Sequence, residues 1–197
     1  MTKLGWSILA IILIGLAAFG SMLSFGSGEH RASAVARVQA KLEQSAPDNA
    51  GVLVVPVAGV QRAALIDSWG DARGGGTRAH HGIDIMAPGG TPVVAAAAGA
   101  VEKLFHSNLG GTTIYVRSPR RGWIYYYAHL SGYAPGLHEG QVVRAGQTIG
   151  YVGDTGDAGP GNTHLHFSMT RTGAADGWWQ GQDVNPFPVL AGKAAGR

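Results

Sequence analysis

Residues 163–167 read THLHF, and the alternation of side chains in this stretch points to a β fold. Successive side chains of a strand point to opposite faces, so His164 and His166 share one face while Leu165 and Phe167 point into a core. Short apolar runs of this kind, separated by glycine and proline, begin at Val52. They predict strands at Val52–Val57, Thr91–Ala97, Gly99–His106, Thr112–Arg117, Trp123–His129, Thr148–Val152 and Leu165–Thr170.

The composition also favours a β-rich fold with tight turns. Glycine accounts for 32 of the 197 residues, and only 14% of the residues are charged. No segment after residue 50 has a long helical period. We therefore expect a mainly β, antiparallel domain over residues 51–190, followed by a short tail at 191–197.

Charge and cysteine content exclude several classes of function. The formal net charge is +3, and the 15 lysines and arginines are scattered, so no nucleic-acid footprint is indicated. The chain has no cysteine, which excludes disulfides, thiolate metal ligands and a cysteine nucleophile.

The N-terminal segment predicts export from the cytoplasm. Leu4–Phe25 carries no charge and, as a helix, would measure roughly 33 Å, enough to cross a bilayer core of about 30 Å. Lys3 precedes this segment, so residues 1–25 are expected to form a transmembrane anchor with the remainder outside the cytoplasm. A cleaved signal peptide is the alternative, with small residues at Ala18 and Gly20. Residues 26–50 are polar and alanine-rich, which predicts a short helical stalk that holds the domain off the membrane, so that the protein is expected in the cell envelope.

A second histidine cluster lies at residues 78–84, which read RAHHGID. On an extended strand His80, Gly82 and Asp84 would share one face, with His81 pointing away and the glycine leaving room for an ion. Histidine and aspartate are both good zinc ligands. Together with one histidine of the 164/166 pair they would supply three protein ligands, the pattern of a catalytic zinc site.

The third cluster is YYYAHL at residues 125–130, an aromatic stretch that leads to His129. Each cluster alone has an ordinary explanation: a chance His-x-His, a surface hydrogen-bonded pair, or a packed core histidine. Their joint presence at strand-compatible spacing between residues 80 and 166 favours a metal site. Three other histidines, His30, His106 and His138, have no such context and are expected to be ordinary surface residues.

The ordered set of motifs resembles the lysostaphin-type zinc metalloendopeptidases, bacterial peptidases that cut peptidoglycan cross-links. The resemblance covers roughly residues 52–190 and implies a compact antiparallel β-sheet domain that binds one Zn²⁺ per chain. Its motifs are SWGDAR at 68–73, HHGID at 80–84, APGGTPV at 87–93, YAHL at 127–130, GQVVRAG at 140–146, IGYVGDTG at 149–156, THLHF at 163–167 and DVNPF at 183–187.

The resemblance also implies roles for the five histidine and aspartate residues. His80, Asp84 and His166 correspond to the zinc ligands, and His129 and His164 to the two catalytic histidines. The spacing alone leaves open which histidine of 164/166 binds metal. Small departures from the family pattern occur at Gly161-Asn162 and at Ser168.

The partners implied are peptidoglycan peptides as substrate, the membrane, and an unidentified regulatory membrane protein. A catalytically silent regulator that recruits another wall hydrolase is the alternative, but a scaffold has no need of His129 and His164. A carbohydrate-binding module would leave the clustered histidines unexplained.

Overall fold

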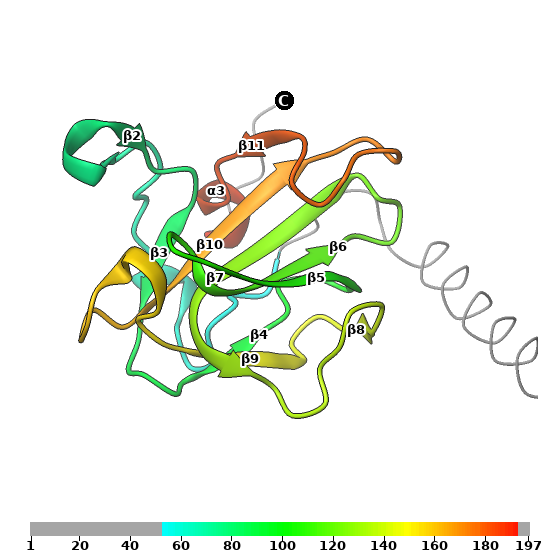
Figure 1. Cartoon of the computed structure of the whole chain (residues 1–197), viewed down its shortest axis with the longest axis horizontal. Helices are drawn as coiled ribbons and strands as arrows, with labels where there is room; N and C mark the ends of the chain where they lie inside the picture. Colours follow the sequence, from blue (N-terminus) through cyan, green and yellow to red (C-terminus); the bar gives the residue numbers. More distant parts are fainter. Residues whose placement is uncertain (1–52, 193–197) are drawn as a thin grey trace, which may run out of the picture. The chain divides into compact units, whose positions relative to one another are not determined.

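The computed structural model describes residues 53–192 (Figure 1). The expected anchor at 1–25, the stalk at 26–50 and most of the tail at 191–197 lie outside the described residues. Within 53–192, no helix has both the length and the apolar character needed to cross a membrane.

The described part of the chain is built around a nine-stranded antiparallel sheet, which confirms the predicted mainly β class. Three strands branch from its main path: β3 (Ile83–Met86) pairs with β10, while β9 (Thr148–Val152) pairs with both β7 and β4 (Pro92–Val94). The main path runs through β11 (Gln182–Val184), β10 (His164–Arg171), β7 (Trp123–Tyr133), β6 (Gly111–Arg117), β5 (Gly99–Ser107) and β8 (Val142–Val143).

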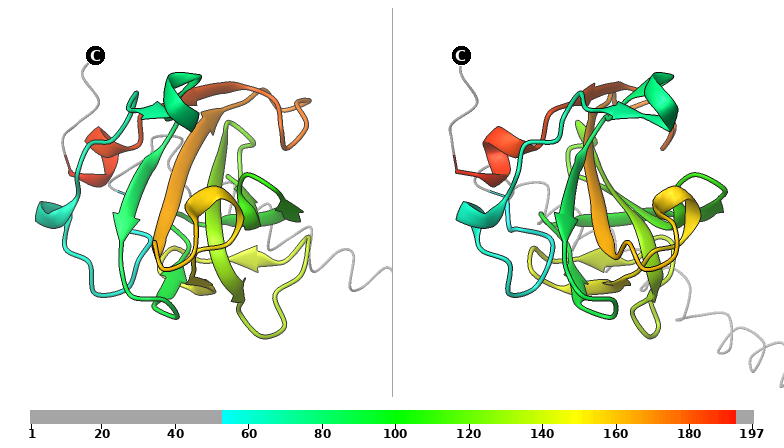
Figure 2. Two further views of the ribbon diagram at one scale, coloured as in Figure 1. Left: turned by 60° about the vertical axis from the view of Figure 1, so that its left-hand side comes forward. Right: turned by 90° about the vertical axis from the view of Figure 1, so that its left-hand side faces the viewer.

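Strand β7 is the centre of this arrangement. Its first part pairs with β6 on one side and with β10 on the other, whereas its last residues, Leu130–Tyr133, pair with β9. One long strand therefore passes from one group of partners to another, and the sheet turns along it so that β4 and β9 lie apart from β5 and β6 (Figures 1 and 2).

The core forms where the inward faces of these strands meet. Leu165, Phe167 and Met169 alternate along β10 and are fully buried, as the period-two pattern predicts. Tyr127 from β7 packs against Phe167 with ring centroids 5.3 Å apart, and its hydroxyl accepts a hydrogen bond from the Ala96 N–H. The histidines of β10 are thereby directed to the opposite face.

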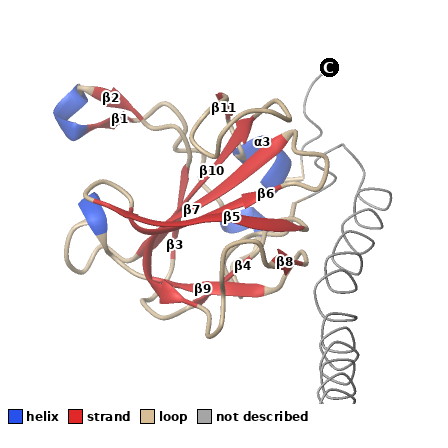
Figure 3. Ribbon diagram, turned by 45° about the vertical axis from the view of Figure 1, so that its right-hand side comes forward, coloured by secondary structure: helices blue, strands red, loops and turns tan. Residues whose placement is uncertain are grey.

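Short helical turns and one small hairpin complete the described structure (Figure 3). The hairpin consists of β1 (Ala72–Arg73), the 3₁₀ turn η2 (Gly74–Gly76) and β2 (Arg78–Ala79), which pair only with each other. The other turns are η1 (Arg62–Ala64), η3 (Gly156–Ala158) and the single α-helical turn α3 (Phe187–Leu190).

The predicted strand at Val52–Val57 is wrong for its described residues. Only Val57 makes an isolated β-bridge, to Val93. Pro56 has no N–H to donate to a ladder, so the segment follows the sheet through scattered contacts such as the Val94 N–H to the Pro56 carbonyl, 3.0 Å. The run predicted at Thr91–Ala97 is likewise shorter, because β4 ends at Val94.

A glycine-to-alanine pair tests the packing of the sheet. A Cβ at Gly99 would press on the Arg117 carbonyl and lie 2.7 Å from Val116 Cγ1, whereas one at Gly132 would meet nothing within 4 Å. Gly99→Ala is expected to lower the free energy of unfolding by about 1–3 kcal/mol through overpacking. Gly132→Ala should stay within about 0.5 kcal/mol of the parent. Urea unfolding measures both, and equal midpoints for the two variants would contradict this account.

Candidate functional site

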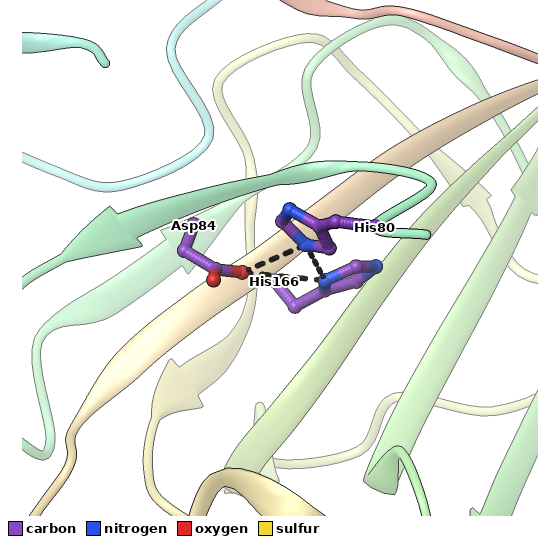
Figure 4. A group of neighbouring side chains, drawn as sticks. All are labelled: His80, Asp84 and His166. Carbon is purple, nitrogen blue, oxygen red and sulfur yellow. Dashed lines mark hydrogen bonds and ion pairs between the residues drawn. The ribbon is translucent and has the colours of Figure 1, made fainter. Parts of the chain in front are cut away.

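Three ligand-type atoms converge at one point of the sheet (Figure 4). His80 Nε2 lies 2.8 Å from His166 Nδ1, and Asp84 Oδ1 lies 3.2 Å from the first and 3.3 Å from the second. Donors bound to zinc at about 2.0–2.2 Å in a tetrahedral arrangement lie roughly 3.3–3.5 Å apart. The triangle formed by His80, Asp84 and His166 therefore fits a single divalent cation with only small adjustment.

The sheet register brings two of these residues together. Strand β10 lies between β3 and β7, and His166 is the direct partner of Asp84 on β3 and of Ala128 on β7. His80 lies just before β3, on the other side of the bend at Gly82. Its ring Nδ1 lies 2.7 Å from the Ser68 carbonyl oxygen, which can only accept, so Nδ1 carries the proton and Nε2 presents its lone pair to the site.

The expected extended run from His80 to Asp84 needs correction. Strand β3 begins at Ile83, and the chain bends at Gly82, so His80 and Asp84 meet through a turn. Gly82 does leave room, but the space is taken by the His166 ring rather than by an ion. A Cβ at Gly82 would lie 2.7 Å from His166 Cε1 and from the Phe167 carbonyl oxygen. A side chain at this position would displace the His166 ring.

His129 and His164 form a second pair beside the triangle, with ring centroids 4.8 Å apart. Their Nδ1 atoms lie 2.8 Å from the carbonyl oxygens of Thr155 and Asn162, respectively. Both Nδ1 atoms therefore carry protons, and both Nε2 atoms are left as bases. His164 Nε2 lies 3.7 Å from Asp84 Oδ1, so this base faces the same point as the three ligand atoms.

The backbone of His129 adopts an unusual conformation. Its φ of 62° lies in the left-handed region, which non-glycine residues rarely occupy. The conformation is held by its own N–H, which donates to the Gly110 carbonyl at 2.8 Å, and by the ring contact with Thr155. Strain of this kind is concentrated at functional sites, where surrounding contacts maintain it.

Burial and neighbouring groups shift the pKa values in the site. Burial alone would raise the pKa of Asp84, but hydrogen bonds from His166 and His80, and the positive charge of these rings when they are protonated, outweigh it and hold the pKa far below its usual range. Burial lowers the pKa of His166, although the Asp84 carboxylate opposes this. Burial also lowers the pKa of His129, against the opposite effect of its hydrogen bond to Thr155. The shifts therefore favour the ionised form of Asp84 and the neutral form of His166 and His129, the forms that metal ligation and proton abstraction require.

All five residues selected from the sequence line one cleft of about 760 Å³. His81 reaches its rim but turns toward Asp183, 2.9 Å away, and remains 60% exposed. His106 and His138 are exposed and lie outside the residues that line the cleft, as expected. His30 lies outside the described residues.

A family model agrees with this geometry. Peptidase family M23 matches residues 78–186, a span that contains the whole histidine and aspartate set. The chain belongs to family M23.

Two relatives of this M23 chain are named as endopeptidases. It is 40% identical over 129 residues to the L-Ala–D-Glu endopeptidase of Bacillus subtilis and 39% identical over 100 residues to the peptidoglycan DD-endopeptidase ShyC of Vibrio cholerae. These matches cover 62% and 50% of this chain but only 38% and 22% of the relatives. The catalytic domain of lysostaphin from Staphylococcus simulans superposes with a TM-score of 0.52 at 32% identity, covering 62% of this chain and 88% of that domain.

Sequence reasoning missed the groups that hold the M23 site in place. The carbonyl oxygens of Ser68, Thr155 and Asn162 orient three of its histidines. A backbone acceptor has no residue-type signature, so no pattern in the sequence could reveal it. Arg73, which contacts Asp84, lies within the quoted SWGDAR motif, but its contact depends on a hairpin that is too short to predict.

The pKa of His129 gives a direct test of the site in the metal-free protein. Because burial lowers this pKa below the ordinary value of 6.5, half-protonation is expected at a lower pH than for a free histidine. Protonation then favours the unfolded state, so the contribution of this residue to the free energy of unfolding is complete above about pH 6.5 and declines as the pH falls. An NMR titration of the ring, assigned with His129→Gln, measures the midpoint. A midpoint at or above 6.5 would contradict the burial that the structure describes.

Proposed function

We propose that this M23 chain is a zinc endopeptidase that hydrolyses peptide bonds in bacterial peptidoglycan cross-links. The observation that carries the proposal is the convergence of a three-ligand triangle and two basic imidazole nitrogens in one cleft. The ligands His80, Asp84 and His166 leave a coordination position open, as catalytic rather than structural zinc sites do. One Zn²⁺ per chain fits this donor set of two nitrogens and one carboxylate oxygen.

The histidines His129 and His164 would carry the protons of the reaction. When bound, zinc supplies Lewis-acid activation of the scissile carbonyl and of the attacking water. Either Nε2 atom is placed to accept a proton from that water, and the resulting imidazolium can donate it to the leaving amine. Because their Nδ1 protons are held by carbonyl oxygens, neither ring needs to change tautomer before it acts.

The relatives support a cell-wall substrate without specifying one bond. Their names describe cleavage of L-Ala–D-Glu and of DD-peptide bonds, and this chain spans only a fraction of their length. A silent regulator is disfavoured because all five residues are present and oriented. The left-handed backbone of His129 also favours a functional site over a scaffold, because strained conformations cluster at functional sites.

The N-terminal sequence supports a proposal for the cellular setting. We propose that residues 1–25 anchor the protein in the cytoplasmic membrane and that residues 26–50 act as a stalk, so that the peptidase domain meets the wall outside the cytoplasm. The uncharged stretch Leu4–Phe25 after Lys3 supports this orientation.

The function is tested by incubating the zinc-loaded full chain with peptidoglycan sacculi that differ in cross-link chemistry. Mass spectrometry should reveal new amino and carboxyl termini at one kind of peptide bond, and a chelator should prevent their appearance. Bound zinc without cleavage of any sacculus would instead support the regulatory alternative.

In the same assay, two variants separate the role of a zinc ligand from that of a catalytic histidine. His166→Ala removes a ligand and should lose both zinc and activity. His129→Ala should retain zinc while turnover falls by about a hundredfold or more, because general acid–base catalysis contributes about 10²–10⁴. Undiminished turnover in His129→Ala would contradict the assignment of His129 to proton transfer.

The anchor is tested by fractionating cells that express the full chain. The protein should sediment with membranes, remain there in high salt, and be digested by protease added outside the cytoplasmic membrane. Its N-terminal sequence should begin at or beside Met1. A mature N-terminus just after Gly20 would establish the cleaved signal peptide instead.

A further inference from the structure

We propose that Arg73 is a positioning residue for the metal ligand Asp84, holding one carboxylate oxygen so that the other faces the metal. This inference rests on the metal site of the proposed function and concerns a residue outside the ligand triangle. It assigns a purpose to the small hairpin β1–η2–β2, which otherwise lies apart from the main sheet (Figure 1).

The two oxygens of Asp84 have different partners. Arg73 Nη2 donates to Oδ2 at 2.5 Å. Oδ1 faces the other way and lies 3.2 Å from His80 Nε2 and 3.3 Å from His166 Nδ1. Because Arg73 occupies Oδ2, the carboxylate offers one oxygen to a metal rather than two, which leaves a coordination position free for water and substrate.

The segment that precedes the hairpin reinforces this arrangement. The Ser68 carbonyl accepts from His80 Nδ1, while the Ser68 hydroxyl accepts from the Asp84 N–H at 3.1 Å. Arg73 Nη2 also lies 3.0 Å from His80 Nδ1, but that nitrogen already directs its proton to Ser68, so these two donors are only neighbours. The carboxylate is therefore the acceptor that holds the guanidinium in place.

Burial gives the Arg73 contact more influence than an ordinary surface pair. The Asp84 side chain is only 18% exposed, so its orientation is set by the few groups that reach it. A guanidinium near a divalent cation is repelled by it, and this arrangement is acceptable because the carboxylate lies between the two charges. Groups that hold a metal-bound carboxylate in this way typically change metal affinity by about 10–100-fold when they are removed.

The same hairpin supplies a matched control. Arg78 also lines the cleft, but its Nη2 pairs with Asp157 Oδ2 at 3.0 Å, and both side chains are more than 40% exposed. An exposed pair of this kind contributes little. Arg78→Ala removes the same charge from the same hairpin without touching a ligand, so it separates the loss of local charge from the loss of the contact with Asp84.

The experiment measures zinc affinity of the metal-stripped full chain by competition with a chromogenic chelator, in the absence of any substrate. Arg73→Ala should bind zinc about 10–100-fold more weakly, Arg73→Lys should recover part of that loss, and Arg78→Ala should match the parent. Once Asp84→Asn has removed the charged acceptor, adding Arg73→Ala should cause little further loss. The visible spectrum of the cobalt-substituted protein should change in Arg73→Ala and not in Arg78→Ala, because the carboxylate is then free to rotate.

Unchanged or tighter zinc binding in Arg73→Ala, with a parental cobalt spectrum, would overturn the inference even if the variant unfolds more easily. The outcome is independent of peptidase activity. A parent that binds zinc but cleaves no sacculus would refute the proposed function and leave this inference standing. If the parent cleaves sacculi while Arg73→Ala binds zinc as tightly as the parent, the proposed function stands and this inference is refuted.

Discussion

The pairing of β10 with both β3 and β7 is the constraint on which the rest of the site depends. One edge of β10 places His166 opposite Asp84, and the other places it opposite Ala128, next to His129. A slip of one residue would turn Leu165 and Phe167 into the cleft and bury both histidines. The burial of Leu165, Phe167 and Met169 opposes that slip, because fully burying each such side chain contributes roughly 1.5–3 kcal/mol. Core packing thus fixes the register, and the register places the proposed ligands His166 and Asp84 opposite each other.

A second principle is that neutral backbone acceptors orient the histidines. The carbonyl oxygens of Ser68, Thr155 and Asn162 each take an Nδ1 proton, which directs the Nε2 lone pairs of His80, His129 and His164 into one space. A carboxylate in the place of the Thr155 carbonyl would hold the same ring, but it would also favour the imidazolium form and raise the pKa of His129. With a carbonyl partner, burial dominates and the pKa of His129 falls. The pKa of Asp84, the only carboxylate of the ligand triangle, is held far below its usual range by hydrogen bonds and charge from His166 and His80 when these rings are protonated.

The sequence predicted those features that follow from local periodicity. The face shared by His164 and His166, the core-facing residues between them and the mainly antiparallel β class all depend on the period of two, and the structure has them. Because both histidines lie on the same face, no spacing argument could decide which one is the ligand. That distinction depends on where the fold places Asp84 and His80. A bend at Gly82, which an extended strand would not contain, brings His80 to the site. The strand predicted at Val52–Val57 does not form over its described residues, because the apolar pattern takes no account of Pro56, which has no N–H to donate to a ladder.

The groups that position the ligands are the hardest to predict, and the hairpin explains why. The strands β1 and β2 contain two residues each, below the length at which side-chain alternation carries information. Between them, Gly74, Gly75 and Gly76 all have positive φ values, which lets the chain reverse within three residues. That reversal places Arg73 against Asp84 and Arg78 against Asp157, so two arginines five positions apart meet different carboxylates. The sequence shows only glycines between two basic residues, whereas the fold places one arginine beside the proposed metal ligand Asp84 and the other on the surface of the cleft.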